Sequence, residues 1–329
     1  MNYYDQIKGL LISNEVYKKV KDYSKNKSDV ETYYNVGKLI IEAQGGEKRA
    51  KYGDGLIKEY SERLIIELND KKYSYRNLMN MRKFYLLFKD KKVVIAGPCS
   101  FGTYEELDGI TKKLKELNVD ILRAGTFKGR TSPYAFQGLR EEGVEILIDI
   151  GKKYNIPVVT ELTSIEQVKK YGNKLDIIQI GTRNMYNYEL LKEVGKLKTP
   201  VILKRGLSAT YNEWLLAAEY IKNEGNNNII LCERGIRGFD PTTRNILDIA
   251  AVPYIKKNTS YPIIVDPSHA TGTRYMIRPL SIASIAAGAD GIMVEAHIRP
   301  EKSLSDARQT INISTLKDII SDINKYQNI

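Results

Sequence analysis

The sequence predicts an α/β protein, a (β/α)8 TIM barrel preceded by a small all-helical N-terminal domain. The residue pattern changes near residue 90, and beyond it eight short β-branched runs alternate with amphipathic helical patterns. Because a helix separates each run from the next, the strands are expected to be parallel, and eight such units in about 240 residues match a closed barrel. We therefore predict a helical domain over residues 1–88 and a barrel over residues 89–329.

The segment before residue 90 contains no proline and places its apolar residues at helical spacing. Three sets show this spacing: Ile7 with Leu10 and Leu11, Val36 with Leu39 and Ile40, and Leu56 with Ile57, Tyr60, Leu64 and Ile65. Glycines at 45–46 and 53–55 interrupt the helical pattern. The segment is therefore expected to form several short helices around a small core.

The eight strand candidates after residue 90 are short and rich in Val and Ile. They lie at 92–96, 119–123, 157–161, 176–179, 200–204, 229–232, 262–265 and 291–295. Helical patterns follow most of them, for example at 104–117, 144–154, 211–223 and 313–326. An open doubly wound sheet is the alternative, but no glycine-rich nucleotide fingerprint follows the first strand, and this favours the closed barrel.

Composition places the chain in the soluble globular class. Hydrophobic residues make up 42% and charged residues 28% of the 329 residues. No run approaches the roughly 18 apolar residues of a membrane span, and the N-terminus lacks a signal-peptide pattern, so we expect a cytoplasmic protein. The net charge of +11 is spread over both regions without a polybasic tail, which favours a solvated surface over nucleic-acid binding. The two cysteines cannot build a disulfide framework.

Basic residues gather where the predicted strands end, and chemistry in such barrels takes place at that face. They are Arg123, Lys128 and Arg130 after the second strand, Arg183 after the fourth, Lys204 and Arg205 at the fifth, and Arg234 after the sixth. Cations that converge on one mouth repel each other unless an anion lies between them. Arg and Lys together suggest a phosphate and a carboxylate, although any one of these residues could simply be a solvated rim residue.

A second group of strand-end residues combines sulfur, nitrogen and oxygen ligands. Cys99, His269 and Glu295 follow or end three strands, and Asp306 lies in the loop after the eighth. The set lacks the short Cys and His spacing of structural zinc sites. It suits a borderline divalent metal with open positions that acts as a Lewis acid on a carbonyl. Taken singly, Cys99 could be a core residue and His269 a structural one.

Six segments at these strand ends resemble the signature segments of 3-deoxy-D-arabino-heptulosonate-7-phosphate (DAHP) synthase, in its short-barrel subgroup. They read AGPCS at 96–100, RAGTFKGRTSPY at 123–134, LKRG at 203–206, CERG at 232–235, DPSHATG at 266–272 and SD at 305–306. The resemblance implies a metal-dependent transferase. It would condense phosphoenolpyruvate with erythrose 4-phosphate, release phosphate and open the shikimate pathway to aromatic amino acids.

The resemblance also implies roles for individual residues. Arg183, Lys204 and Arg234 would hold the phosphate of phosphoenolpyruvate, Arg123 and Lys128 its carboxylate, and Arg130 and Thr131 the sugar phosphate. Cys99, His269, Glu295 and Asp306 would ligate a divalent ion of the Mn, Fe, Co or Zn type, and Asp266 would meet both the sugar and the metal site. Lys128, Asp266 and His269 are the expected catalytic residues. Gly129 and the pair Ala307-Arg308 depart from the family pattern, which usually has Pro and Gly-Pro there.

The helical segment is similar to the N-terminal domain that precedes a PD-(D/E)XK nuclease domain in a family of unknown function. YYNVGK at 33–38, KYG at 51–53, SYRNL at 74–78 and MRKFY at 81–85 carry this likeness. The nuclease domain itself is not recognisable. We expect residues 1–88 to be regulatory or oligomerising, with an inert spacer or barrel cap and a nucleic-acid-binding module as alternatives.

Two rival functions stay open at this point. A 3-deoxy-octulosonate 8-phosphate synthase would use a five-carbon sugar phosphate, but that family resembles Lys-Ala-Asn where this chain has Lys128-Gly129-Arg130. A nucleic-acid-binding or scaffold protein with a vestigial barrel is the other rival, and the retained ligands and cations disfavour it. The expected partners are phosphorylated small molecules and further copies of the chain in a dimer or tetramer, with neither membrane nor nucleic acid.

Overall fold

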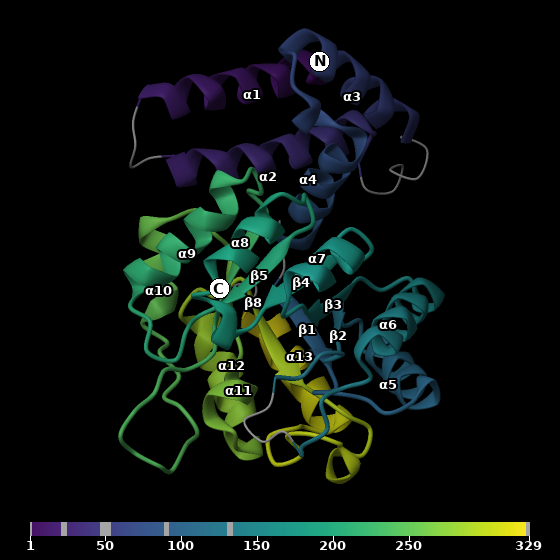
Figure 1. The fold of residues 1–329 in the computed structure, drawn as a ribbon, viewed down its shortest axis with the longest axis vertical. Coiled ribbons are helices and arrows are strands. Elements are labelled where there is room, and N and C mark those ends of the chain that lie inside the picture. The colour runs from purple at the N-terminus through teal and green to yellow at the C-terminus, as the bar shows by residue number, and fades with distance from the viewer. Residues whose placement is uncertain (1, 21–24, 47–53, 89–91, 130–133, 327–329) are drawn as a thin grey trace. The chain divides into compact units, whose positions relative to one another are not determined.

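The computed structural model describes residues 2–20, 25–46, 54–88, 92–129 and 134–326 (Figure 1). The chain divides near residue 90 into two compact units, one helical and one a barrel. Within the described residues, no helix is both long and apolar enough to cross a membrane.

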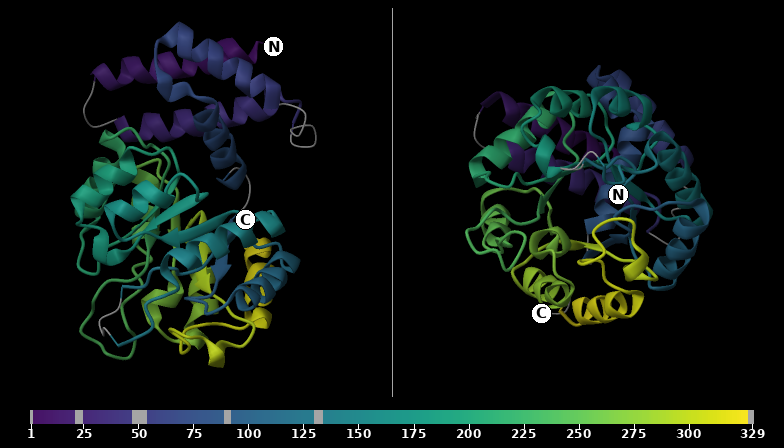
Figure 2. Two further views of the ribbon diagram at one scale, coloured as in Figure 1. Left: turned by 45° about the vertical axis from the view of Figure 1, so that its right-hand side comes forward. Right: turned by 60° about the horizontal axis from the view of Figure 1, so that its bottom comes forward.

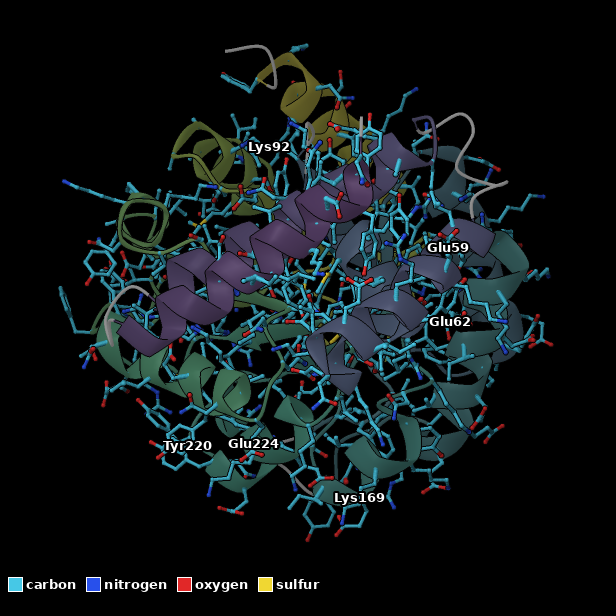
Figure 3. The ribbon with its side chains drawn as sticks, turned by 90° about the horizontal axis from the view of Figure 1, so that it is seen from above. Glu59, Glu62, Lys92, Lys169, Tyr220 and Glu224 are labelled. Atoms are coloured by element: carbon cyan, nitrogen blue, oxygen red, sulfur yellow. The ribbon has the colours of Figure 1, made fainter. Side chains whose placement is uncertain are left out.

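The N-terminal unit is all-helical, as predicted. It comprises α1 (Tyr3–Val20), α2 (Lys25–Ala43), α3 (Asp54–Leu68), the 3-10 turn η2 (Lys71–Tyr73) and α4 (Tyr75–Phe88). Its core is formed by Ile7, Val36, Ile40, Ile57, Leu64, Leu78 and Met81, most of which lie on the predicted apolar stripes. On the outer face of α3, Glu59 and Glu62 point to solvent (Figure 3). The apolar spacing thus separates a buried from a solvated face.

Gly37 and Asn77, from the segments YYNVGK and SYRNL noted in the sequence, determine how α2 and α4 pack together. Gly37 lets the helices approach closely, since a Cβ there would lie 2.2 Å from the backbone oxygen of Met81. Buried Asn77 donates to the carbonyl of Lys72 at 2.7 Å, and its Oδ1 accepts from the Tyr33 hydroxyl at 3.2 Å. These contacts tie the turn before α4 to α2, so the residues have a structural role inside the unit.

The second unit is a closed barrel of eight parallel strands in sequence order (Figure 2). The strands are β1 (Val93–Gly97), β2 (Ile121–Arg123), β3 (Val158–Glu161), β4 (Ile177–Ile180), β5 (Val201–Lys204), β6 (Ile229–Glu233), β7 (Ile263–Val265) and β8 (Gly291–Glu295). β1 pairs with β2 on one side and β8 on the other, in the register Ile95 with Met293. All eight predicted strands are confirmed, with ends that differ by at most two residues.

Helices surround the strands on the outside of the barrel (Figure 2). They are α5 (Tyr104–Glu116), α6 (Arg140–Tyr154), α7 (Ile165–Tyr171), α8 (Tyr188–Gly195), α9 (Tyr211–Asn223), α10 (Ala251–Asn258), α12 (Ile277–Ala286) and α13 (Ile313–Tyr326). The short α11 (Pro267–Thr271) directly follows the end of β7. α6 begins at Arg140, before the expected residue 144, because Glu141 and Glu142 extend its first turn, where acidic side chains are favoured. The strands are buried on both faces, because helices cover their outer face and side chains fill the barrel interior on the other, which explains their nearly uninterrupted apolar runs.

Candidate active site

A cleft of about 1030 Å³ opens among loops that follow the barrel strands. Basic side chains outnumber acidic ones in its lining: Arg123, Lys128, Arg140, Arg183, Lys204, Arg234 and Arg244 against Glu141, Glu161 and Asp306. Such a concentration of positive charge attracts anions and holds them by charge-assisted hydrogen bonds. Five predicted cations, Arg123, Lys128, Arg183, Lys204 and Arg234, therefore share one cleft, as the strand ends indicated.

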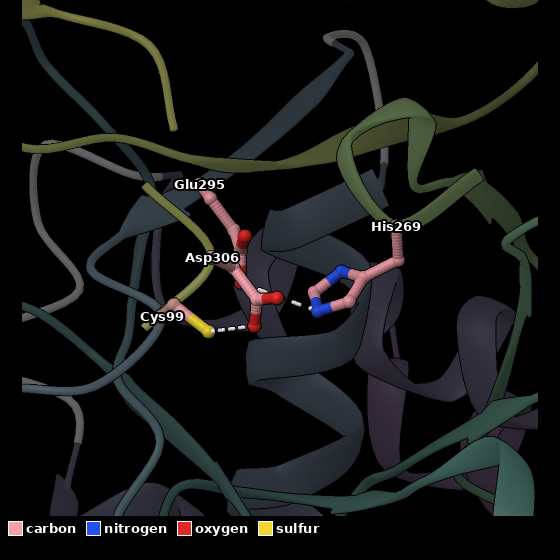
Figure 4. Close-up of side chains that lie close together, drawn as sticks. All are labelled: Cys99, His269, Glu295 and Asp306. Atoms are coloured by element: carbon pink, nitrogen blue, oxygen red, sulfur yellow. Dashed lines mark hydrogen bonds and ion pairs between the residues drawn. The ribbon is translucent and has the colours of Figure 1, made fainter. Parts of the chain in front are cut away.

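The four predicted metal-ligating residues also come together at this face. One ligand atom from each of Cys99, His269, Glu295 and Asp306 lies within 4.8 Å of the others (Figure 4). Cys99 Sγ lies 2.8 Å from Asp306 Oδ2, and His269 Nε2 lies 3.2 Å from Glu295 Oε1. One sulfur, one imidazole nitrogen and two carboxylates form a donor set that fits a borderline divalent metal.

The ionisation states of Cys99 and Glu295 determine how the cluster can bind a cation. Burial and the Glu295 carboxylate raise the pKa of the Cys99 thiol to about 12. Burial alone would raise the pKa of Glu295, but His269 and Arg123, whose Nη1 lies 2.9 Å from Oε1, hold it well below its usual range. Without a cation, the carboxylate is therefore ionised and the thiol protonated, so metal binding must displace the thiol proton.

Lys128 is a cation at the edge of the same cluster. Its Nζ lies 2.9 Å from Cys99 Sγ. Desolvation lowers the pKa of Lys128, but Cys99 and Glu295 outweigh that effect and raise it overall. These neighbours hold Lys128 as an ammonium group that donates hydrogen bonds.

Asp266 contacts both the group of candidate metal ligands and the cations of the cleft. As the N-cap of α11 it accepts from the backbone nitrogen of His269, while its Oδ2 lies 2.7 Å from His269 Nδ1 and 2.6 Å from Lys204 Nζ. Although burial opposes ionisation, His269 and Lys204 hold the pKa of Asp266 far below its usual range. A proton on Nδ1 leaves the lone pair of Nε2 facing the cluster, as a metal ligand requires.

The cations of the cleft differ in how they are paired. Arg123 and Lys204 form buried ion pairs with Glu295 and Asp266. Arg183 is exposed and donates to the backbone oxygen of Gly129 at 3.3 Å. Arg234 is buried, burial lowers its pKa, and within the described residues no carboxylate forms an ion pair with it. A guanidinium that lines the cleft without a carboxylate partner is suited to bind an anionic ligand. The predicted sugar-phosphate residues, Arg130 and Thr131, lie outside the described residues.

Two strand-end residues do not face the cleft. Arg205 pairs with Glu233 and Asp248 at 2.9 and 2.7 Å, so the inclusion of Arg205 among the converging cations is wrong. His297 accepts from the Arg299 backbone at Nδ1, and its Nε2 lies 2.9 Å from Glu106 Oε1, which makes it structural.

Gln309 is a site residue that was not predicted from the sequence. This buried residue donates to Glu295 Oε2 at 2.6 Å and thereby orients a candidate ligand. It lies only three residues after Asp306, but a neutral amide is not part of the predicted set of cations and metal ligands.

A parallel barrel whose strand ends hold a mixed-ligand cluster beside a cation-rich cleft belongs to the class of barrel enzymes that act on phosphorylated anions. Within that class, the chain belongs to the DAHP synthetase I family, whose sequence model matches residues 85–328. The DUF1016 N-terminal domain model matches residues 13–98. Both matches confirm the resemblances noted in the sequence.

A relative and a solved structure are named for the same activity as this family, and a more distant relative is named for the octulosonate activity. The phospho-2-dehydro-3-deoxyheptonate aldolase of Thermotoga maritima is 50% identical over 232 residues, covering 70% of this chain and 69% of the relative. The crystal structure of that DAHP synthase matches with a TM-score of 0.70 at 49% identity, covering 72% of this chain and 69% of the other. A 2-dehydro-3-deoxyphosphooctonate aldolase of Geobacter sulfurreducens is 29% identical over 250 residues, or 70% of this chain and 90% of the relative.

Proposed function

We propose that this chain condenses phosphoenolpyruvate with erythrose 4-phosphate to give DAHP and phosphate, the first step of the shikimate pathway. The observation that carries the proposal is the position of Arg234, buried and without an ion-pair partner among the described residues, in the same cleft as Lys204 and two members of the metal cluster, His269 and Asp306. Two phosphorylated anions repel each other in water, and a cleft of fixed cations removes much of that barrier by holding them together.

The proposed contacts follow the charges of the cleft. Arg183, Lys204 and Arg234 bind the phosphate of phosphoenolpyruvate, and Arg123 and Lys128 its carboxylate. Arg130 and Thr131 are assigned to the sugar phosphate on the family resemblance alone. These contacts would place the methylene carbon (C3) of phosphoenolpyruvate beside the aldehyde carbon of the sugar. A bond forms between these two carbons, water adds to the phosphate-bearing carbon (C2), and phosphate leaves by cleavage of its bond to C2.

Cys99, His269, Glu295 and Asp306 would hold a divalent metal ion of the Mn, Fe, Co or Zn type. When bound, it would supply Lewis-acid polarisation of the aldehyde oxygen. Asp266 fixes the ring of His269 and the ammonium of Lys204, and Gln309 fixes Glu295. Lys128 would donate a hydrogen bond to the oxygen on which negative charge develops.

The substrate assignment can be tested by following the ultraviolet absorbance of phosphoenolpyruvate with two aldose phosphates. We expect its loss with erythrose 4-phosphate and Mn²⁺, and little loss with arabinose 5-phosphate. Consumption with only the five-carbon sugar would overturn the assignment in favour of an octulosonate synthase. Arg278→Lys is a control variant that should consume phosphoenolpyruvate as the wild type does. Arg278 is an exposed arginine paired with Asp318 and Asp322 away from the cleft.

Three further assignments are proposals that complete this function. Residues 1–88 are a helical domain with a regulatory or oligomerising role, and residues 89–329 are the catalytic domain. The protein assembles as a homo-oligomer, a dimer or a tetramer. It acts in the cytoplasm on phosphorylated small molecules and does not require nucleic acid.

A further inference from the structure

Arg205 lies beside Lys204 in the sequence, yet its side chain forms a buried network outside the cleft. The residue follows β5 directly, and its backbone nitrogen donates to the carbonyl of Cys232 on β6. Its Nη1 lies 2.9 Å from Glu233 Oε2 and 2.7 Å from Asp248 Oδ2, and its Nε donates to the carbonyl of Ala209 at 2.9 Å. These ion pairs occupy the guanidinium, so Arg205 is unavailable to a substrate.

Glu233 connects Arg205 to the turn that carries Arg234. This carboxylate is fully buried, and its second oxygen, Oε1, accepts from the backbone nitrogen of Gly235 at 2.6 Å. Gly235 has a φ of +90°, and a Cβ there would lie 2.8 Å from Cβ of Asn245, so the turn has little room to adjust. Arg234, between these two residues, is thus presented to the cleft by a backbone that Glu233 holds from one side.

Asp248 connects Arg205 to the long loop between β6 and α10. The carboxylate also accepts from the Tyr211 hydroxyl at 2.8 Å, and the Arg205 guanidinium carbon lies 4.6 Å from the centre of the Tyr211 ring. Elsewhere in this loop, Asn245 donates through its backbone to Ala270 and through its side chain to the carbonyl of His269. The loop is therefore fastened at one point by Arg205 and at another by the helix that carries His269.

We propose that Arg205 is a positioning residue for phosphoenolpyruvate binding. It holds the Glu233–Gly235 turn and thereby orients the guanidinium of Arg234. This inference rests on the proposed function, because it assigns Arg234 to the phosphate. A lysine cannot replace Arg205, because a single ammonium cannot reproduce its fixed fork between two carboxylates and the Ala209 carbonyl. Removing one partner also leaves Glu233 buried without its cation, so the turn must rearrange.

A double-mutant cycle separates this role from a merely structural one. Phosphoenolpyruvate binding to the full-length, Mn²⁺-loaded protein would be measured by calorimetry for the wild type, Arg205→Lys, Arg234→Lys and the double variant. We expect Arg205→Lys to weaken binding by at least about tenfold, the factor that corresponds to losing one charge-assisted contact. In the Arg234→Lys background, Arg205→Lys should weaken phosphoenolpyruvate binding by less than about twofold. The effects of two substitutions are not additive when one residue acts through the other.

Equal losses in both backgrounds, or unchanged binding in Arg205→Lys, would overturn the inference. Wild-type protein that binds no phosphoenolpyruvate would instead refute the proposed function. If Arg205→Lys fails to fold, Glu233→Gln serves the same cycle, since its amide oxygen can still accept from Gly235 while the charged partner of Arg205 is lost. KM for erythrose 4-phosphate should stay within about twofold in these variants, and Arg278→Lys should leave every value unchanged.

Discussion

Replacing Asp266 with asparagine is expected to destabilise the barrel by about 3–5 kcal/mol in the metal-free protein. Asp266 is fully buried, and its Oδ2 faces two donors, Lys204 Nζ at 2.6 Å and His269 Nδ1 at 2.7 Å. If the amide oxygen of the substituted side chain keeps the contact with the His269 backbone, its NH₂ group faces those two donors and cannot accept from either. Two charge-assisted hydrogen bonds of about 1.5–3 kcal/mol each are then lost, about 3–6 kcal/mol together, and this agrees with the roughly 3–5 kcal/mol typical of a broken buried ion pair.

Urea unfolding followed by tryptophan fluorescence measures this change in the barrel alone. Trp214 is the single tryptophan of the chain and is buried on α9, with its Nε1 donating to the carbonyl of Leu203. The unfolding midpoint should fall without a change in slope. Asp322→Asn, which removes an exposed ion pair with Arg278, is the control and should change little. A loss below about 1 kcal/mol in Asp266→Asn would refute the reasoning that this carboxylate satisfies two buried hydrogen-bond donors.

Three further predictions test the site and the N-terminal unit. Chelation should abolish turnover and Mn²⁺ restore it, because Cys99, His269, Glu295 and Asp306 are the proposed ligand set; full turnover in protein shown by elemental analysis to be metal-free would contradict this. Lys204→Ala or Arg234→Ala should raise KM for phosphoenolpyruvate and lower kcat at a cost of about 1.5–3 kcal/mol, and steady-state kinetics identical to the wild type would remove these residues from the site. Deleting residues 1–88 should preserve metal binding but change subunit assembly, thermal stability or the response to aromatic amino acids, as measured by light scattering, melting and turnover; identical behaviour in all three would identify a passive appendage.

The barrel could be predicted from sequence because each strand is apolar on both faces and most are followed by a clear helical pattern. Runs such as Val201–Lys204 carry this signal without help from distant residues. The start of α6 was harder to place, because it depends on acidic residues in its first turn and not on the apolar stripe. Helix ends depend on local contacts of the first and last turns, which the apolar pattern does not encode.

The part of the candidate site that lies at strand ends could be predicted, because the ends of parallel strands meet at one face of the barrel. Cys99, His269 and Glu295 follow or end strands, and the closed barrel brings them together. Arg205 was misplaced because successive residues at a strand end point to opposite sides, so its neighbour Lys204 faces the cleft while Arg205 faces Glu233 and Asp248. The sequence near Arg205 does not predict its ion pairs with Glu233 and Asp248, which lie 28 and 43 residues further along the chain.

The pairing of β1 with β8 has a consequence for synthesis of the chain on the ribosome. Cys99 and Asp306 are 207 residues apart, so at about 5–20 residues per second the two ends of the metal cluster emerge about 10–40 s apart. Throughout this interval the free edge of β1, an apolar strand, has no permanent neighbour on the β8 side and is open to pairing with other chains. The contact of Cys99 with Asp306 and the closure of the sheet both wait for the C-terminal part of the chain, so loss of reactivity of this thiol toward a labelling reagent would report when a nascent chain completes its barrel.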